Sequence, residues 1–204
     1  MTTLDSPNLV VIGNGMVGHR FVEQLVDGGA TRAWNVVVFG EEPRPAYDRI
    51  HLSALFQGRT VADLTLPEPG YYEANDVALL AGDPVIEVNT EEHVVRAASG
   101  MALPYDKLVF ATGSRPFVPP IPGADGPDCF VYRTIEDVEA IRARAVECRT
   151  GAVIGGGLLG LEAAGALNAA GLETHVVELA PRLMAVQLDD GGGAMLRRWI
   201  EGRG

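Results

Sequence analysis

A glycine pattern that follows a short apolar run limits the folds open to this chain. Residues 9–12 are apolar and lead into Gly13, Gly15 and Gly18, which have the spacing G-x-G-x-x-G. A helical pattern of apolar residues comes next, and residues 35–39 are largely β-branched and aromatic, as in a buried strand. Strand, glycine turn, helix and strand in this order predict a Rossmann-like unit that binds a dinucleotide.

The same order of elements returns near the end of the sequence. The apolar residues 152–154 lead into Gly155, Gly157 and Gly160, and a helix rich in alanine and leucine follows. Residues 174–177 then have the pattern of the next strand. We interpret the two stretches as a diverged internal duplication, with one dinucleotide-binding unit in each copy.

The sequence between the two copies predicts less regular structure. Residues 41–75 are rich in proline and charge and are expected to form an extended, loop-heavy excursion. Residues 77–105 alternate as in a small antiparallel meander, and residues 107–111 form a buried strand. Residues 116–127 hold five prolines and two glycines and predict a linker, which leads to a helix over residues 134–147. We therefore predict an α/β protein with two Rossmann-like dinucleotide-binding units, the second incomplete, and a small antiparallel β meander inserted in the first.

An acidic residue follows the second strand of each copy, where dinucleotide-binding folds bind a ribose. Glu41 takes this position in the first copy and Glu178 in the second. A carboxylate there bonds a free ribose 2′-hydroxyl and repels a 2′-phosphate, so Glu178 favours NADH over NADPH. Arg182 lies four residues further on and would soften that preference. The alternative for both copies is a turn that is merely rich in glycine.

Charge and composition exclude several classes of protein. The net charge is −11, and no basic cluster suits a nucleic acid or an anionic membrane. No run approaches the ~18 apolar residues of a membrane span, and the N-terminus lacks the pattern of a signal peptide. Cys129 and Cys148 match no metal spacing, the histidines are scattered, and both thiols are expected to be buried and reduced. A cytoplasmic protein without a metal site is therefore expected.

Three motifs together resemble the flavoproteins that bind two dinucleotides, a superfamily similar to the pyridine nucleotide-disulfide oxidoreductases. They are residues 13–18, residues 111–116 (ATGSRP) and residues 155–160. In that superfamily an NAD domain interrupts an FAD domain. The resemblance covers about residues 8–201 and is specific for the superfamily.

Further segments narrow the resemblance. Residues 41–53 resemble the FAD loop shared by ferredoxin-type reductases and the large subunit of assimilatory NAD(P)H nitrite reductase. Ferredoxin-type reductases usually place a lysine where this chain has Ala54, whereas residues 103–123 and 181–189 are similar to the nitrite reductase version. The resemblance therefore implies an enzyme that passes electrons from NADH to FAD, as in the reduction of nitrite to ammonia during nitrate assimilation.

This resemblance also implies a domain division and a set of FAD ligands. Residues 1–116 would be the N-terminal part of the FAD-binding domain, residues 117–150 a linker and helix, and residues 151–204 a truncated NAD-binding domain. The residues expected to contact FAD, beside Gly13, Gly15, Gly18 and Glu41, are Arg49, Ser53, Thr112, Gly113 and Arg115.

One residue is expected near the reacting rings. By the resemblance Glu162 lies where nicotinamide meets flavin, and it is the candidate catalytic residue. The structural alternatives are a surface ion pair for Arg49, a helix N-cap for Ser53 and a first-turn helix residue for Glu162.

The stretch after residue 151 holds too few residues for a whole nucleotide domain, so the chain is expected to be a fragment. The iron–sulfur cluster and sirohaem of the family belong to a C-terminal part that is absent here. The resemblance implies a homodimer and a small nitrite reductase subunit as partners. Two alternatives stay open: a fragment of a ferredoxin- or rubredoxin-type reductase, and an inactive nucleotide-binding remnant.

Overall fold

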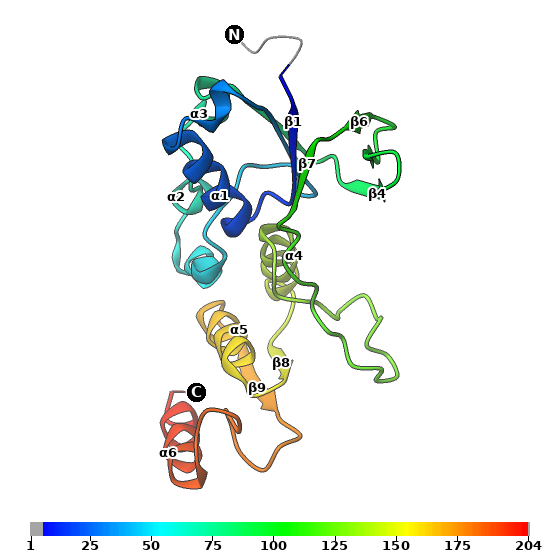
Figure 1. Cartoon of the computed structure of the whole chain (residues 1–204). Helices are drawn as coiled ribbons and strands as arrows, with labels where there is room; N and C mark the ends of the chain where they lie inside the picture. The colour runs from blue at the N-terminus through cyan, green and yellow to red at the C-terminus, as the bar shows by residue number, and fades with distance from the viewer. Residues whose placement is uncertain (1–5, 204) are drawn as a thin grey trace. The chain divides into compact units, whose positions relative to one another are not determined.

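The computed structural model describes residues 6–203, and the chain divides into two compact units. The first unit comprises Met1–Asp48 and Leu64–Arg115, and the second comprises Arg49–Asp63 and Pro116–Gly204. Figure 1 labels most of the helices and strands of both units.

A sheet of four parallel strands forms the centre of the first unit, in the order β3-β2-β1-β7. The strands are β1 (Asn8–Ile12), β2 (Asn35–Gly40), β3 (Val77–Ala81) and β7 (Lys107–Phe110). Their side chains alternate between the two faces, and both faces are apolar. The predicted α/β fold with a parallel sheet is confirmed.

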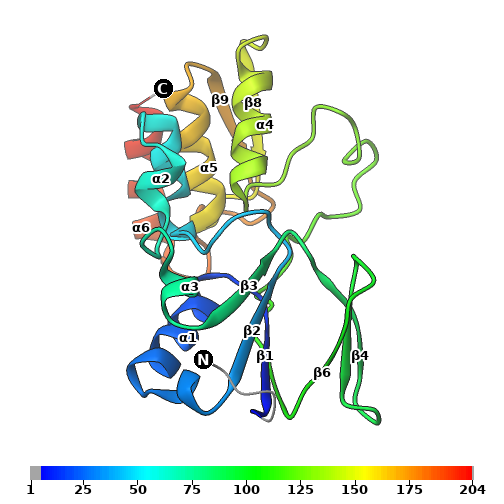
Figure 2. The ribbon, with the colours of Figure 1, turned by 90° about the horizontal axis from the view of Figure 1, so that it is seen from above.

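Different elements cover the two faces of this sheet. On one face, Val11 packs with Val22 of α1 and Tyr72 of α3, and on the other, Val10 packs with Val95 of β5. Figure 2 shows α1 and α3 on one side of the sheet and β4 and β6 on the other. The helical elements of this part are α1 (Met16–Asp27), η1 (Ala30–Arg32) and α3 (Tyr71–Ala74), and the antiparallel strands are β4 (Val85–Asn89), β5 (Val94–Ala97) and β6 (Ala102–Pro104).

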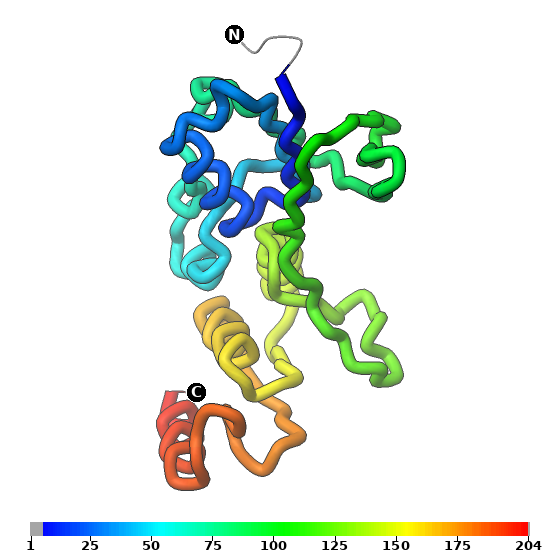
Figure 3. Tube along the Cα trace, viewed as in Figure 1, coloured from blue at the N-terminus to red at the C-terminus, as the bar shows by residue number. Residues whose placement is uncertain are grey.

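The second unit is built around two parallel strands, β8 (Thr150–Ile154) and β9 (Glu173–Val177). Helix α5 (Leu158–Ala169) connects them, and α6 (Asp190–Glu201) follows the loop after β9. The short helix η2 (Arg49–Gln57) packs against α5 and against α4 (Ile135–Ala145). Figure 3 shows the trace before α4 as a long loop without helical turns, as its proline content predicts.

Helix α4 begins where the sequence predicts, because Thr134 caps it. The Thr134 hydroxyl accepts a hydrogen bond from the Asp137 backbone N–H, and the Asp137 carboxylate accepts one from the Thr134 N–H. This reciprocal pair is a capping box. Within residues 6–203 no helix combines the length and the apolar content needed to cross a bilayer.

Two expectations from the sequence are wrong. Residues 41–75 are less loop-heavy than predicted, since they contain η2, α2 (Val61–Leu64) and α3, each too short to give a periodic signal. The cysteines are free thiols but are not buried: Cys129 is exposed and Cys148 is half-buried. Cys129 lies in the loop before α4, where no apolar layer covers it, and its thiol donates to the Gly123 carbonyl at 3.3 Å.

Candidate functional site

The glycines of the first loop have distinct steric roles. A Cβ atom on Gly13 would lie 2.2 Å from the Ala111 carbonyl oxygen, and one on Gly18 would lie 2.0 Å from the Gly13 carbonyl oxygen. A Cβ on Gly15 would meet nothing within 4 Å. Gly13 and Gly18 are therefore needed for the packing of loop, helix and strand, whereas Gly15 faces open space. Dinucleotide-binding loops use their second glycine in this way, to let a pyrophosphate approach the backbone.

Asn14 offers an unused hydrogen-bond donor in the same loop. Its Oδ1 accepts from the Tyr72 hydroxyl at 2.8 Å, but its Nδ2 is buried without a partner among residues 6–203. The N-cap of α1, Gly15, has no side-chain cap either, so the first N–H groups of the helix stay available to an anion. An orphaned donor beside an uncapped helix N-terminus fits a bound phosphate group.

A buried histidine, His19, is linked to this loop by hydrogen bonds. Tyr72 donates its only hydroxyl proton to Asn14, so its oxygen accepts from the Nδ1–H of His19 at 3.1 Å. Burial lowers the pKa of His19, and the Glu23 carboxylate, 3.8 Å from Nε2, opposes that shift. The neutral ring therefore completes a hydrogen-bonded chain from α1 to the glycine loop, through three residues that the sequence did not single out.

The acidic position after β2 is filled by two neighbouring glutamates, of which one is engaged. The Glu42 carboxylate accepts from the buried Tyr47 hydroxyl at 2.7 Å, and its carbonyl accepts from Gly82. Glu41 is exposed and directly follows Gly40, the last residue of β2. Of the two glutamates, Glu41 therefore has the carboxylate that is accessible to a ribose.

The end of β7 lies against the same glycine loop. The Ala111 N–H donates to the Ile12 carbonyl at 2.7 Å, and the Thr112 nitrogen is 2.9 Å from the Cβ that Gly13 would carry. Thr112, Gly113 and Arg115 are exposed in the segment that follows. The structure thus brings together residues from both ends of the first unit's sequence at the carboxyl ends of parallel strands, where such folds bind ligands.

The second glycine loop repeats the construction of the first. A Cβ on Gly160 would lie 1.9 Å from the Gly155 carbonyl oxygen, whereas one on Gly157 would meet nothing within 4 Å. Gly157 is the N-cap of α5 and has no side-chain cap. The duplication therefore extends to the steric roles of the second and third glycines, whereas the first glycines differ, because a Cβ on Gly155 would meet nothing within 4 Å.

Glu178, directly after β9, is tied to this loop. Its carboxylate accepts from the Gly156 N–H at 2.6 Å and from the Ala180 N–H at 2.7 Å. The Ala180 and Gly156 hydrogen bonds hold the pKa of Glu178 below its ordinary value, so it is ionised at neutral pH. Each oxygen keeps lone-pair capacity for a ribose hydroxyl.

Glu162 shares the second unit with Arg49 and Ser53. Glu162 lies in the second turn of α5, so the first-turn alternative is wrong. Arg49 donates to the Arg133 carbonyl at 3.3 Å, and Ser53 lies in η2 just after the kink at His51. Burial raises the pKa of Tyr132 to about 12, and the negative charge of Glu162 adds to this shift. Tyr132 therefore joins the candidate residues, although no pattern in the sequence singles it out.

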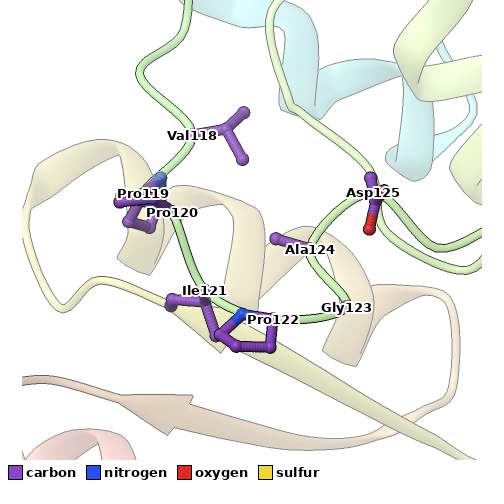
Figure 4. Close-up of a pocket in the computed structure, with 8 residues that line it drawn as sticks. All are labelled: Val118, Pro119, Pro120, Ile121, Pro122, Gly123, Ala124 and Asp125. Atoms are coloured by element: carbon purple, nitrogen blue, oxygen red, sulfur yellow. The ribbon is translucent and has the colours of Figure 1, made fainter.

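A hollow in the second unit is lined by a single loop segment, and its lining does not favour a nucleotide. Residues 118–125 curve around a volume of about 480 Å³, and Figure 4 shows their side chains. Asp125 is the one ionisable residue in its lining, and a carboxylate repels phosphate. In the described chain no group of three or more His, Cys, Asp or Glu residues is arranged to hold a metal ion.

Comparison with known proteins gives the family. The pattern of the pyridine nucleotide-disulphide oxidoreductases matches residues 7–204. The chain belongs to this family. It is 54% identical over 196 residues to the NADH nitrite reductase large subunit of Escherichia coli, and 43% identical over 197 residues to a nitrite reductase of Bacillus subtilis. Each alignment covers 96% of this chain but only 23% and 24% of the relative, so the chain spans about a quarter of their length.

Solved structures of reductases share the fold. A putidaredoxin reductase bound to putidaredoxin superposes with a TM-score of 0.86 at 30% identity, covering 97% of this chain and 48% of the other. A ferredoxin reductase from Rhodopseudomonas palustris gives 0.88 at 28% identity, with 98% and 49% covered. The similarity to both the nitrite reductase and the ferredoxin-type groups agrees with the resemblance found in the sequence.

Proposed function

We propose that this chain is an NADH-dependent flavin oxidoreductase module that binds FAD in its first nucleotide unit and NADH in its second. The observation that carries the proposal is the repeated glycine loop, with the same glycine open to a ligand in each copy. The proposed domains are residues 1–116 for FAD, 117–150 as linker and helix, and 151–204 for NADH, with the second Rossmann-like unit incomplete and the meander inserted in the first.

The residues of the first nucleotide unit contact different parts of FAD in this proposal. Gly15 leaves room for the pyrophosphate at the N-terminus of α1, Asn14 adds a donor, and Glu41 accepts from the ribose. Thr112 and Gly113 line the same edge, and Arg115 contributes a positive charge on the adenine side. FAD, when bound, supplies a carrier that takes a hydride from a reduced nicotinamide and passes the electrons on.

The second nucleotide unit, residues 151–204, would bind the nicotinamide dinucleotide. Gly157 admits the pyrophosphate to the N-terminus of α5, and the Glu178 carboxylate accepts from the ribose hydroxyls and favours NADH. Glu162 is the residue proposed beside the nicotinamide. Arg49 and Ser53 remain proposed flavin contacts from the family resemblance.

The physiological acceptor follows from the close relatives. Because the chain is 54% and 53% identical to two nitrite reductase large subunits, we propose that a longer protein carrying it reduces nitrite to ammonia in the cytoplasm, through an iron–sulfur cluster and sirohaem outside these residues. A homodimer and a small subunit would be its partners. The rival is a ferredoxin-type reductase, which the shared fold supports, and it would reduce a ferredoxin with NADH but leave nitrite unchanged.

Flavin identity and flavin reduction test the proposal. The purified chain is saturated with FAD or FMN in parallel, freed of unbound flavin and denatured, and the released flavin is identified. FAD should be retained in preference to FMN, which lacks the second phosphate and the adenosine. NADH added without oxygen should then bleach the bound flavin. Preferential retention of FMN contradicts the first site, and an unbleached FAD complex identifies a binding remnant without turnover.

A further inference from the structure

Arg182 lies in the loop between β9 and α6, residues 179–189, hereafter the 179–189 loop. An arginine shortly after the ribose-binding acid is the residue that dinucleotide folds use to accept the 2′-phosphate of NADPH. Arg182 is placed to be such a residue in the sequence, four positions after Glu178. Whether its guanidinium can contact a 2′-phosphate depends on the groups around it.

All three guanidinium nitrogens of Arg182 have partners within this region. Nε donates to the Leu188 carbonyl at 2.9 Å, Nη2 to the Ala185 carbonyl at 3.3 Å, and Nη1 to the Asp190 carboxylate at 2.8 Å. The side chain is 29% exposed, whereas Asp190 is 94% exposed. Since an exposed ion pair is weak, the two carbonyls hold the guanidinium more firmly than Asp190 does.

The stem of Arg182 is fixed by the first turns of α6. Gly193 is the buried residue of that helix, and a Cβ there would lie 2.9 Å from Cδ and 3.0 Å from Cβ of Arg182. Only a glycine at position 193 therefore leaves the arginine stem where it lies. The 179–189 loop is also tied to the glycine loop, because the Met184 N–H donates to the Gly156 carbonyl at 2.9 Å.

We propose that Gly193 and the carbonyls of the 179–189 loop make the second site selective for NADH by withholding Arg182 from a 2′-phosphate. This inference rests on the proposed function, since it assumes that the second unit binds a nicotinamide dinucleotide. The Glu178 carboxylate repels the 2′-phosphate of NADPH. The guanidinium of Arg182, held by its own loop, does not pair with that phosphate. Arg182 thus acts as a positioning residue of the loop and leaves the preference for NADH intact.

A glycine-to-alanine pair in α6 tests the proposal. Gly193→Ala forces the arginine stem to move, while alanine favours the helix over glycine. Gly191→Ala is the matched control, because its Cβ would make an ordinary contact, 3.6 Å from the Asp189 carboxylate. Dissociation constants of NADH and NADPH are measured by calorimetry on the 204-residue chain, with thermal unfolding as the check on folding.

Gly193→Ala should lower the ratio of the NADPH to the NADH dissociation constant by about tenfold, the effect of one new charge-assisted contact. Gly191→Ala should leave the ratio unchanged, and adding Arg182→Ala to Gly193→Ala should restore it. The inference is overturned if the two alanine variants give the same ratio, or if Arg182→Ala alone weakens NADPH binding selectively. A wild-type chain that binds neither nucleotide overturns the proposed function as well, whereas NADH binding with an unmoved ratio overturns this inference only.

Discussion

Replacing Tyr72 by phenylalanine tests the hydrogen-bonded chain behind the first glycine loop. The substitution removes one hydroxyl from a side chain that is 4% exposed and leaves the apolar packing of α3 in place. Two partners lose their hydrogen bond: the Nδ1–H of His19 at 3.1 Å and the Oδ1 of Asn14 at 2.8 Å. The Asn14 amide, whose Nδ2 already lacks a partner among residues 6–203, is then held by no hydrogen bond at either end.

The size of the effect follows from burial. A buried polar group left without a partner costs about 1–3 kcal/mol, and two such groups give an expected loss of about 2–6 kcal/mol in the free energy of unfolding. FAD binding should weaken by about tenfold, because Asn14 is no longer oriented toward the pyrophosphate. Urea unfolding followed by circular dichroism measures the first quantity, and calorimetric titration with FAD measures the second.

Tyr71→Phe is the matched control. Tyr71 packs edge-on against both His19 and Tyr72, but its hydroxyl makes no hydrogen bond to the described residues. Its loss should change the free energy of unfolding by less than about 0.5 kcal/mol. Equal losses in the two variants would refute the reasoning, since they would mean that the His19–Tyr72–Asn14 chain contributes nothing.

Three further outcomes are expected. Because burial keeps the pKa of His19 below its ordinary 6.5, the unfolded chain takes up that proton first, so stability should fall as pH drops below 6.5; a His19→Gln variant that keeps the same pH slope in urea unfolding would contradict this. Glu178→Gln should weaken NADH binding by about tenfold and relax the rejection of NADPH, as seen by calorimetry with both nucleotides, and unchanged affinities would place the ribose contact elsewhere. Thr134→Ala should lower the free energy of unfolding by about 1 kcal/mol through loss of the α4 cap, and a thermal melt like that of wild type would show that the cap is dispensable.

The regular parts of the fold were predictable because they depend on local patterns. The apolar runs at β1, β2 and β7, the glycine spacing and the Thr134 cap each act within a few residues. The parallel sheet then follows from the order of strand, helix and strand. The short helices between residues 49 and 74 escaped prediction, since α2 and α3 have four residues each and η2 has nine with a kink at His51, too few for a clear helical period.

The contacts around the candidate sites were predictable only in part. The glycines have fixed spacing, and Glu41 and Glu178 each follow the second strand of their copy, so the sequence identifies them as candidates. Tyr72 is 58 positions from Asn14, and no local pattern in the sequence predicts their hydrogen bond. The position of Arg182 is visible in the sequence, but its sequestration depends on carbonyls that become neighbours only when the 179–189 loop folds.

Binding measured on crossed glycine variants tests most directly the claim that one chain carries two separate dinucleotide sites. Gly15 and Gly157 have extended backbones that any residue adopts, and an added Cβ meets nothing within 4 Å in either loop, so alanine should leave both units folded. By calorimetry, Gly15→Ala should weaken FAD binding and leave NADH binding at the wild-type value, and Gly157→Ala should do the reverse. Variants that each weaken both nucleotides equally, or that change neither, would contradict the account.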